Sequence, residues 1–503
     1  MVSTAVAQAE PSPSEASLAD HLARGRALAS LAEDEAAKRA YLDALKRDPT
    51  CLEALLELAR LALRSGHRSA AITCWGQAIF CHPAEPAAHV NLGALLLESG
   101  ALEAARAEFA DALALAPDLG PAHQGMARAL TGLGEAAAAE SHWRCGLADG
   151  WLAPQPYRGA GLPLPLLVLV SAKGGNIPTG ALIDDTVFAV TALYAEGYDA
   201  ARPLPAHAAV FNAIGDADLC AAALAKAAEC AVRTSAPVVN APAAVAATTR
   251  TQIAARLAGI PGMVVPEIRT LARGDVANAG LSFPVLVRAP GFHTGQHFVR
   301  VEAPADLATA IAELPGDELL AIEPLDARGA DGLARKYRVM FIGGALFPLH
   351  LAVSPDWKVH YFSAAMAHIA AARAEEAAFL ADMPGVLGAK AMAALSEIAA
   401  QLALDYGGVD FGLSPAGEVL LFEANAGMVI QPPGPEPIWD YRRAAIGRAL
   451  DAVKALLLAK ADAAFGCCPP AAMPGPNAPR PNAPRPNAPG PNAPGPNAPG
   501  PNA

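Results

Sequence analysis

The feature that most constrains the fold is an internal repeat of 34 residues in the N-terminal part of the chain. Three kinds of residue keep this interval in phase: a proline, an aromatic residue and a pair of alanines. A period of this length predicts stacked helical hairpins, in which small residues let two helices approach, the aromatic residue fills the gap to the next repeat, and proline ends the second helix. The positions are Pro49, Pro83 and Pro117; Tyr41, Trp75, Phe109 and Trp143; and Ala36-Ala37, Ala70-Ala71, Ala104-Ala105 and Ala138-Ala139.

This pattern resembles the tetratricopeptide repeat, with four units at about 17–50, 51–84, 85–118 and 119–152. The resemblance implies an α-helical repeat solenoid over residues 17–152, with a concave groove that binds a peptide or a partner protein. A spacer, or a dimerisation surface without a ligand of its own, explains the repeats equally well. Nothing in these residues identifies a partner.

Composition narrows the classes of function. A chain of 503 residues has room for about three domains, and a net charge of -12 argues against binding to nucleic acid or to an anionic membrane. The eight cysteines include no C-x-x-C pair, so neither a disulfide framework nor a cysteine zinc site is predicted. Residues 1–18 lack the pattern of a signal peptide, and the longest apolar run, 162–170, is too short to span a bilayer. We expect a cytoplasmic protein with no nucleic-acid or membrane partner.

After the repeats, the pattern changes to alternating strands and helices, which predicts a small α/β domain with a parallel sheet over residues 160–244. The apolar run 164–171 reads as a buried strand, and Lys173-Gly174-Gly175 follows it. These glycines either cradle a phosphate group or form a tight turn. Residues 184–197 have a helical period, so a helix is expected there.

A larger α+β region is predicted at 245–462, between the small domain and a biased C-terminal tail. The tail, residues 466–503, repeats Pro, Asn, Ala and Gly or Arg, and so it buries too little apolar surface to offset the entropy of ordering. Residues 1–16 are also predicted to be disordered. A partner-binding role for the tail is an alternative to a plain extended segment.

Residues 409–428, VDFGLSPAGEVLLFEANAGM, predict a β-hairpin whose turn is 414–417, because proline and glycine suit the inner positions of a turn. Counting outward from this turn places Leu413 opposite Glu418 and Asp410 opposite Leu421. Strand side chains alternate between faces, so one face is expected to be polar and the other to join the core. The polar face would carry Asp410, Leu421, Glu423 and Asn425, and the core face Val409, Phe411, Leu413, Leu420 and Phe422.

Asp410 and Glu423 are then diagonal neighbours, close enough to bind one hard cation through their oxygen atoms. An acidic, solvent-facing hairpin edge is the alternative explanation for two carboxylates alone. Asn425, two residues after the glutamate, and the motifs upstream favour a metal site.

Two further segments carry candidate ligand-binding residues. The strand 283–288 ends in Arg288 and runs into a loop with two glycines at 289–297, which predicts a phosphate grip made of a guanidinium and backbone N–H groups. An ordinary hairpin with a surface arginine is the alternative. Lys336 and Arg338 share one face of a strand, where they either meet an anionic ligand or pair with acidic neighbours.

In this order, the segments of residues 160–460 resemble the ATP-grasp superfamily. The resemblance is carried by Arg288 with its glycine loop, by Glu323 at the end of a strand, by LARKYRVMFIGG, and above all by VDFG and LLFEAN. It implies an ATP-grasp fold of two α+β lobes with a nucleotide between them. The implied site comprises Asp410, Glu423 and Asn425 for Mg²⁺ or Mn²⁺; Arg250, Arg288, Gly291, Thr294, Gly295 and Glu323 for ATP; and Arg288 and Arg338 as catalytic cations.

The resemblance implies ATP-dependent ligation of a carboxylate to an amine through an acyl-phosphate, with a peptide or protein acceptor favoured by the repeats. One departure is that Arg250 and Arg288 stand where the family commonly has lysine, and arginine is not interchangeable with lysine at a phosphate site. The alternative is a non-catalytic interaction scaffold, in which the repeats bind a partner and the ATP-grasp-like region binds a nucleotide without turnover or is degenerate.

Overall fold

The computed structural model describes residues 16–31, 33–148, 150–290, 295–359, 364 and 366–465. Among them the chain divides between Gly150 and Trp151 into two compact units, one of helical hairpins and one of mixed α/β structure. The predicted tail 466–503 lies outside the described residues, and so does the predicted N-terminal tail 1–16, apart from Ala16.

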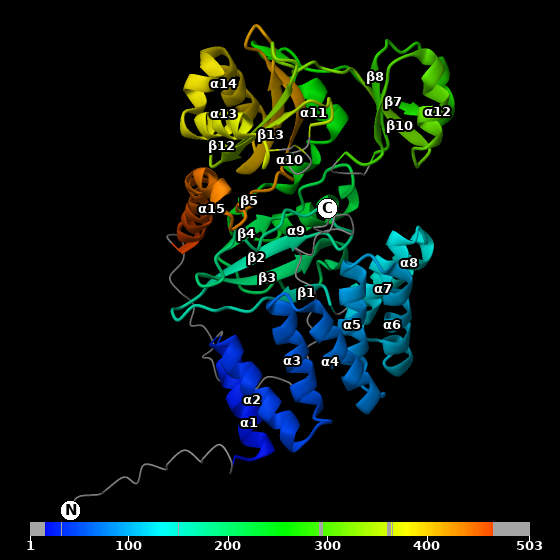
Figure 1. Cartoon of the computed structure of the whole chain (residues 1–503), viewed down its shortest axis with the longest axis vertical. Coiled ribbons are helices and arrows are strands. Elements are labelled where there is room, and N and C mark those ends of the chain that lie inside the picture. Colours follow the sequence, from blue (N-terminus) through cyan, green and yellow to red (C-terminus); the bar gives the residue numbers. More distant parts are fainter. Residues whose placement is uncertain are drawn as a thin grey trace, which may run out of the picture. The chain divides into compact units, whose positions relative to one another are not determined.

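The first unit consists of helices that pair as four hairpins, and successive hairpins begin 34 residues apart (Figure 1). Each predicted proline lies two residues beyond the end of a second helix, as a residue without a backbone N–H should. The prediction of a helical repeat region is therefore confirmed. The helices are α1 (Leu18–Ser30), α2 (Asp34–Arg47), α3 (Leu52–Arg64), α4 (Arg68–Cys81), α5 (Pro86–Glu98), α6 (Leu102–Leu115), α7 (Gly120–Gly132) and α8 (Ala136–Ala148).

The predicted aromatic residues fill the space between hairpins, as the case of Phe109 on α6 shows. A Cβ atom added at Gly125, in the first helix of the next hairpin, would lie 2.2 Å from the Phe109 ring. Only a glycine therefore fits against this ring. The four aromatic residues and the second alanine of each pair are all buried: Tyr41, Trp75, Phe109, Trp143, Ala37, Ala71, Ala105 and Ala139.

The second unit begins with a five-stranded sheet in the order β1-β3-β2-β4-β5, parallel except for β1. The predicted helix at 184–197 is wrong, because Phe188–Tyr194 forms β3 and only Ala195–Gly197 turns into a short 3-10 helix. This run, FAVTALY, is short and rich in β-branched and aromatic residues, which favour a strand when neighbours bury it. The strands are β1 (Leu152–Pro154), β2 (Leu164–Val170), β3, β4 (Ala209–Asn212) and β5 (Val238–Val239).

Two further sheets follow in the chain. One has four strands in the order β7-β10-β8-β9, all antiparallel, with helix α12 (Leu307–Ala312) beside it (Figure 1). The other has five strands in the order β12-β11-β13-β14-β6. Their bounds are β6 (Met263–Val264), β7 (Ile268–Ala272), β8 (Val285–Arg288), β9 (Phe298–Val301), β10 (Glu318–Ile322), β11 (Ala334–Ile342), β12 (Ala345–Ser354), β13 (Tyr406–Leu413) and β14 (Val419–Asn425).

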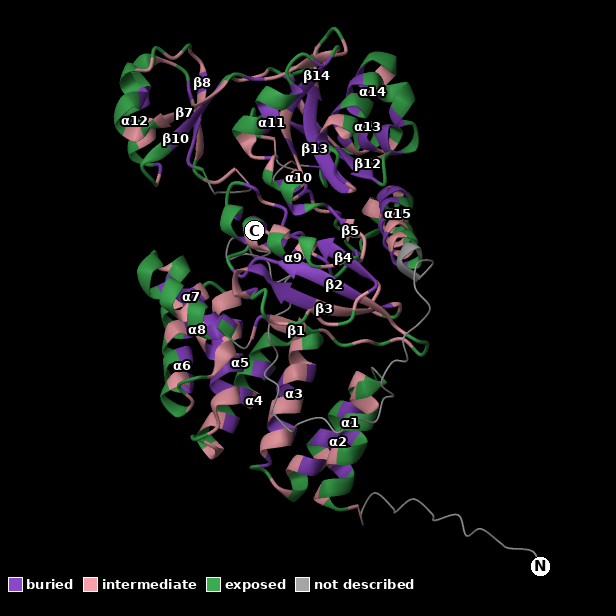
Figure 2. Ribbon diagram, turned by 180° about the vertical axis from the view of Figure 1, so that it is seen from behind, coloured by how far each residue is buried: buried purple, intermediate pink, exposed green. Residues whose placement is uncertain are grey.

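The first and third sheets share one hydrophobic core, whereas the four-stranded sheet has a smaller core of its own. Strands such as β2 and β13 are almost wholly buried (Figure 2). Asn240 ties the two sheets together, since its side-chain amide exchanges two hydrogen bonds of 2.8 Å with the backbone of Tyr406. Because these two sheets share a core, their packing does not test the domain boundary predicted between 160–244 and 245–462, which stays a prediction.

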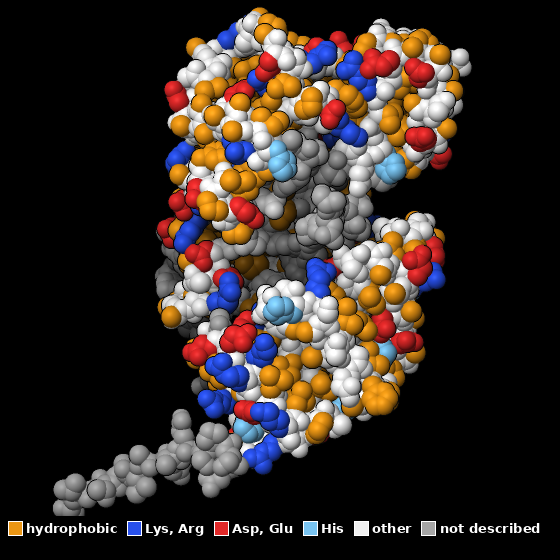
Figure 3. All heavy atoms as spheres, viewed as in Figure 1, with side chains coloured by type: hydrophobic (Ala, Val, Ile, Leu, Met, Phe, Trp, Pro, Cys, Tyr) orange, Lys and Arg blue, Asp and Glu red, His pale blue; other side chains and the backbone are white. Residues whose placement is uncertain are grey.

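The remaining helices cover the sheets. Among the described residues no single helix has the length and apolar composition to cross a membrane. The bent pair α13 and α14 passes that test jointly, and its buried hydrophobic residues belong to the shared core. On the face shown in Figure 3, acidic and basic side chains are interspersed. The helices are α9 (Ala221–Val232), α10 (Pro242–Ala246), α11 (Arg250–Leu257), α13 (Ala370–Ala381), α14 (Met383–Leu402) and α15 (Asp440–Phe465).

The packing of the repeats leads to a matched pair of glycine substitutions. Gly125→Ala should lower the free energy of unfolding of the repeats by about 1 to 3 kcal/mol, because the new methyl group has to displace Phe109. Gly76→Ala, in helix α4 with no atom within 4 Å of the added Cβ, should be neutral or stabilising by about 0.5 to 1 kcal/mol. Urea unfolding followed by helical circular dichroism compares the two, and equal effects would contradict this packing.

Candidate functional site

The predicted hairpin forms, but its register differs from the prediction. The Ser414 N–H donates to the Glu418 carbonyl at 2.9 Å, so Leu413 lies opposite Val419 rather than Glu418. Gly417 has a φ of 71°, a left-handed conformation that adds one residue to the loop as a bulge. The sequence prediction assumed a four-residue turn without a bulge, so its register was displaced by one residue.

A second irregularity in the hairpin brings the two carboxylates face to face. Phe411 pairs with Leu421, and the next pair is Asp410 with Glu423, so Phe422 is an extra residue on β14. Asp410 and Glu423 are therefore direct cross-strand partners rather than diagonal ones. The predicted position of Leu421 on the polar face is wrong, because it lies with Phe411 in the hydrophobic core.

Asp410 is buried and paired with two cations from β11, the neighbouring strand. Arg338 donates from Nε to Oδ1 at 2.6 Å and from Nη2 to Oδ2 at 2.8 Å, while Lys336 Nζ lies 2.9 Å from Oδ2. Burial acts to raise the pKa of Asp410, but attraction to Arg338 and Lys336 outweighs it and holds the pKa well below its usual range. The sequence left two alternatives for Lys336 and Arg338, an anionic ligand or an acidic neighbour. In the structure both side chains pair with an acidic neighbour, Asp410.

Glu423 is held by a third cation, Arg250, which begins helix α11. Arg250 Nη2 lies 2.9 Å from Glu423 Oε1, and the same oxygen accepts a hydrogen bond of 2.9 Å from the amide of Asn425. Asn425 Oδ1 in turn accepts from the Gly427 N–H at 2.9 Å. Burial would raise the pKa of Glu423, but attraction to Arg250 outweighs it and lowers this pKa.

Arg288 brings the four-stranded sheet into the same site. It is the last residue of β8, it is 8% exposed, and its guanidinium lies 5.5 Å from the centroid of the Phe298 ring. Burial, and then repulsion from Arg250, lowers its pKa to about 10, so it is charged at neutral pH. Glu423 attracts it and opposes this shift, which places Arg288 within electrostatic reach of the hairpin.

Asp218 belongs to this site, although the sequence did not single it out. Its Oδ2 accepts a hydrogen bond of 3.2 Å from the backbone N–H of Arg250. Burial raises the pKa of Asp218 and is the largest influence on it. Asp218 follows β4, at the carboxyl end of a parallel strand, where side chains of open α/β sheets commonly meet ligands. Its position after a predicted parallel strand was therefore the sequence signal that could have identified it.

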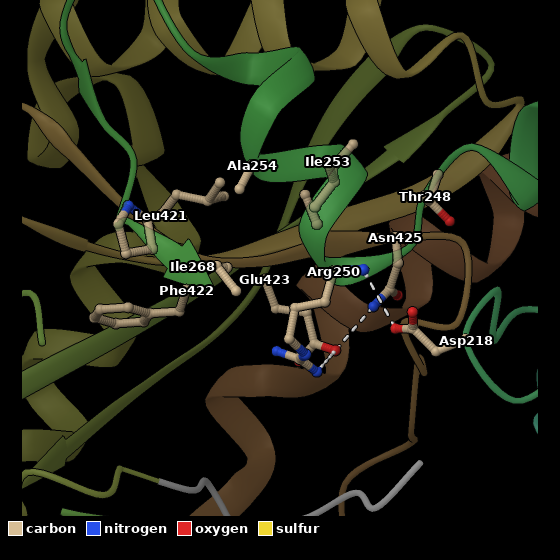
Figure 4. Close-up of a pocket in the computed structure, with 12 residues that line it drawn as sticks. Asp218, Thr248, Arg250, Ile253, Ala254, Ile268, Leu421, Phe422, Glu423 and Asn425 are labelled. Carbon is tan, nitrogen blue, oxygen red and sulfur yellow. Dashed lines mark hydrogen bonds and ion pairs between the residues drawn. The ribbon is translucent and has the colours of Figure 1, made fainter. Parts of the chain in front are cut away.

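Asp218, Arg250, Glu423 and Asn425 converge around a small cavity (Figure 4). Its volume is about 30 Å³, which is room for water but not for a nucleotide. Apolar residues close the rest of it, among them Ile253 from α11. A nucleotide therefore requires the surrounding elements to open.

Of the other predicted residues, two make hydrogen bonds with residues other than the carboxylate pair and two lie outside the described residues. Gly291 and Thr294 are outside them. Gly295 is described, and its carbonyl accepts a hydrogen bond of 2.8 Å from Lys358 Nζ. Glu323 is exposed just after β10, where it accepts a hydrogen bond of 3.1 Å from the Glu267 N–H. These two hydrogen bonds do not join Gly295 or Glu323 to the carboxylate pair.

The donor atoms of the site suit a hard cation, since Asp410, Glu423 and Asn425 offer the oxygen ligands that Mg²⁺ prefers. The charges alter this conclusion, because the two carboxylates are already matched by Lys336, Arg338 and Arg250. A bare dication would add positive charge to a site whose negative charges are already neutralised. A metal ion that arrives with a polyphosphate brings its own compensating negative charge, so in that form it matches the charges of these residues.

Comparison with known proteins supports the identity of the first unit alone. The tetratricopeptide repeat family matches residues 56–119, and the N-terminal unit is a tetratricopeptide repeat region. No curated protein matches the chain. No comparison identifies an ATP-grasp domain, so that resemblance stays a prediction.

Solved structures that resemble the chain cover only part of it. MamA is 20% identical, with 26% of this chain and 76% of that chain covered and a TM-score of 0.25. A thermophilic tetratricopeptide repeat protein of Thermus thermophilus is 26% identical over 27% of this chain and 75% of its own, with a TM-score of 0.24. A mutant of the Thermobaculum terrenum O-GlcNAc transferase is 25% identical over 34% of this chain and 36% of its own, with a TM-score of 0.26.

The buried ion pairs predict a large cost for removing one charge. Asp410→Asn should lower the free energy of unfolding by about 3 to 5 kcal/mol, because it leaves the half-buried Arg338 and Lys336 without the buried carboxylate that pairs with both of them. Asp326→Asn is the matched control, since its pair with Arg328 is exposed and should contribute less than about 1 kcal/mol. Urea denaturation of both variants checks this, and a similarly small loss in both would show that the Asp410 cluster contributes little.

Proposed function

We propose that residues 151–465 form an ATP-grasp-type nucleotide site and that the protein is an ATP- and Mg²⁺-dependent carboxylate-amine ligase. The product is an amide formed through an acyl-phosphate, and the repeats present a peptide or protein acceptor. The observation that supports this most is the pairing of three cations, Arg250, Lys336 and Arg338, with the cross-strand carboxylates Asp410 and Glu423. A fourth cation, Arg288, is attracted by Glu423.

A polyanionic ligand can compete with the acids of the chain for these cations. Arg250 contacts Glu423, Lys336 and Arg338 contact Asp410, and Glu423, Asp216 and Asp218 attract Arg288. Guanidinium groups bind phosphate oxygens with two parallel hydrogen bonds, and such charge-assisted bonds are roughly twice as strong as neutral ones. A polyphosphate therefore replaces the carboxylates as the partner of some of these side chains.

In this proposal the residues of the chain act by position and charge. Arg288 and Arg338 are the fixed cations that offset charge on the transferred phosphoryl group, and no side-chain nucleophile is required. Asp410, Glu423 and Asn425 hold the metal, which when bound with the nucleotide supplies further charge compensation at the phosphate oxygens. The apolar wall around Ile253 keeps water away from a reactive intermediate.

The rival function is a scaffold that binds a nucleotide without turnover. The ion pairs favour it, because an acid held by arginine at short distance is less available to a metal than a free carboxylate. The arginines at positions 250 and 288 favour it as well, since a guanidinium is larger than the ammonium that the family commonly uses.

Titration of Mg·ATP into the full chain by calorimetry tests the site. Arg288→Met should weaken binding by about 10- to 100-fold, which corresponds to loss of one charged hydrogen-bonding group of about 1.5 to 3 kcal/mol. Arg233→Met, an exposed arginine at the end of α9, is the matched control and should bind like the wild type. Absence of binding to the folded wild-type protein contradicts the proposal.

Turnover separates the ligase from the scaffold. Phosphate release from ATP, measured with a panel of amino acids and peptides as acid and amine, should be dependent on Mg²⁺ in the wild type. Glu423→Gln should lose this Mg²⁺-dependent phosphate release. Its side-chain oxygen can still accept the hydrogen bonds from Asn425 and Arg250, because the substitution removes the charge and keeps the oxygen. ATP binding without phosphate release for every combination of acid and amine tested would support the scaffold instead.

A further inference from the structure

We propose that the third repeat binds a divalent transition-metal ion such as Zn²⁺ or Co²⁺ through His89, Glu108 and Asp111. One ligand atom from each of these side chains lies within 4.8 Å of the others. His89 comes from α5, the first helix of the hairpin, and the two acids come from α6 at a spacing of three residues, which puts them on one face. This inference is independent of the proposed nucleotide site.

The chemistry of the three groups selects the metal. His89 is 8% exposed, and its Nδ1 lies 2.8 Å from Glu108 Oε2, so a hydrogen bond holds the imidazole toward the acid. An imidazole with two carboxylates suits zinc, cobalt or manganese, whereas Mg²⁺ and Ca²⁺ prefer oxygen ligands alone. Two carboxylates also balance the charge of a dication.

The site is open on one side. Asp111 is exposed, whereas Glu108 is half-buried and His89 is buried, so an ion reaches the buried nitrogen past the acids. On binding, the metal takes the place of the hydrogen bond between His89 Nδ1 and Glu108, and the neutral ring ligates it through Nδ1 with its one proton on Nε2. Three protein donors leave further coordination positions for water.

The 34-residue period supplies a second observation. The positions equivalent to His89, Glu108 and Asp111 in the fourth repeat are occupied by His123, His142 and Cys145, and these too are metal-ligating residue types. There His123 Nδ1 and His142 Nδ1 lie 2.8 Å apart, which shows that the first two positions face each other in this repeat as well. The equivalent positions hold His21, Ala40 and Asp43 in the first repeat and Leu55, Cys74 and Gln77 in the second, so all three positions carry metal-ligating residue types in the two C-terminal repeats alone.

Co²⁺ titration of the full chain, followed by its visible absorption, tests the third repeat. A site of imidazole and carboxylates gives d-d bands without the sulfur-to-cobalt charge-transfer band of a thiolate site, so binding at the cysteines is recognised separately. Glu108→Gln and Asp111→Asn should each weaken the thiolate-free binding by at least about tenfold. Both changes preserve side-chain volume, and Asp111 is exposed.

The controls are Glu103→Gln and Asp118→Asn, exposed acids within and just beyond α6, which should bind like the wild type. The metal should also raise the melting temperature of the wild type and of the controls, but not of the two ligand variants. Absence of a thiolate-free band, or equal affinity in all four variants, would overturn the proposal. A melting temperature measured without metal identifies any variant that has lost its fold.

Discussion

The second unit depends on a buried ion pair across two neighbouring strands. Asp410 on β13 is buried and pairs with the half-buried Arg338 and Lys336 on β11, the neighbouring strand of the third sheet. Desolvating three charges is costly, and the cost is recovered only when their geometry is satisfied. The sheet register, the hairpin bulge and the position of Glu423 are therefore linked, because a shift of any of them would leave a buried charge unpaired.

The same cluster joins elements that are distant in the sequence. Glu423 reaches Arg250 on α11, Arg250 reaches Asp218 after β4, and Arg288 approaches from the four-stranded sheet. Each sheet of the second unit thus contributes a charged group to one place. A site of this kind is closed in the structure and has room for water only, so ligand binding has to exchange ion pairs within the protein for ion pairs with the ligand.

The sequence predicted what short patterns determine and missed what long-range contacts determine. The repeats were predictable because several residue classes keep one period, and the hairpin was predictable from its turn residues. The register was not, because the left-handed Gly417 and the extra residue Phe422 are local geometries that alternation of side chains does not reveal. Asp218 was missed because only the folding of the first sheet brings it to Arg250.

We propose that the cation cluster is a polyphosphate site in which metal binding depends on the nucleotide. Calorimetric titration of the full chain with ATP in the presence of a chelator, and separately with Mg²⁺ alone, tests this most directly. ATP should bind without metal, Mg²⁺ alone should produce no binding heat, and ATP with Mg²⁺ should bind more tightly than ATP alone. Binding of Mg²⁺ alone, with ATP binding only afterwards, would contradict it.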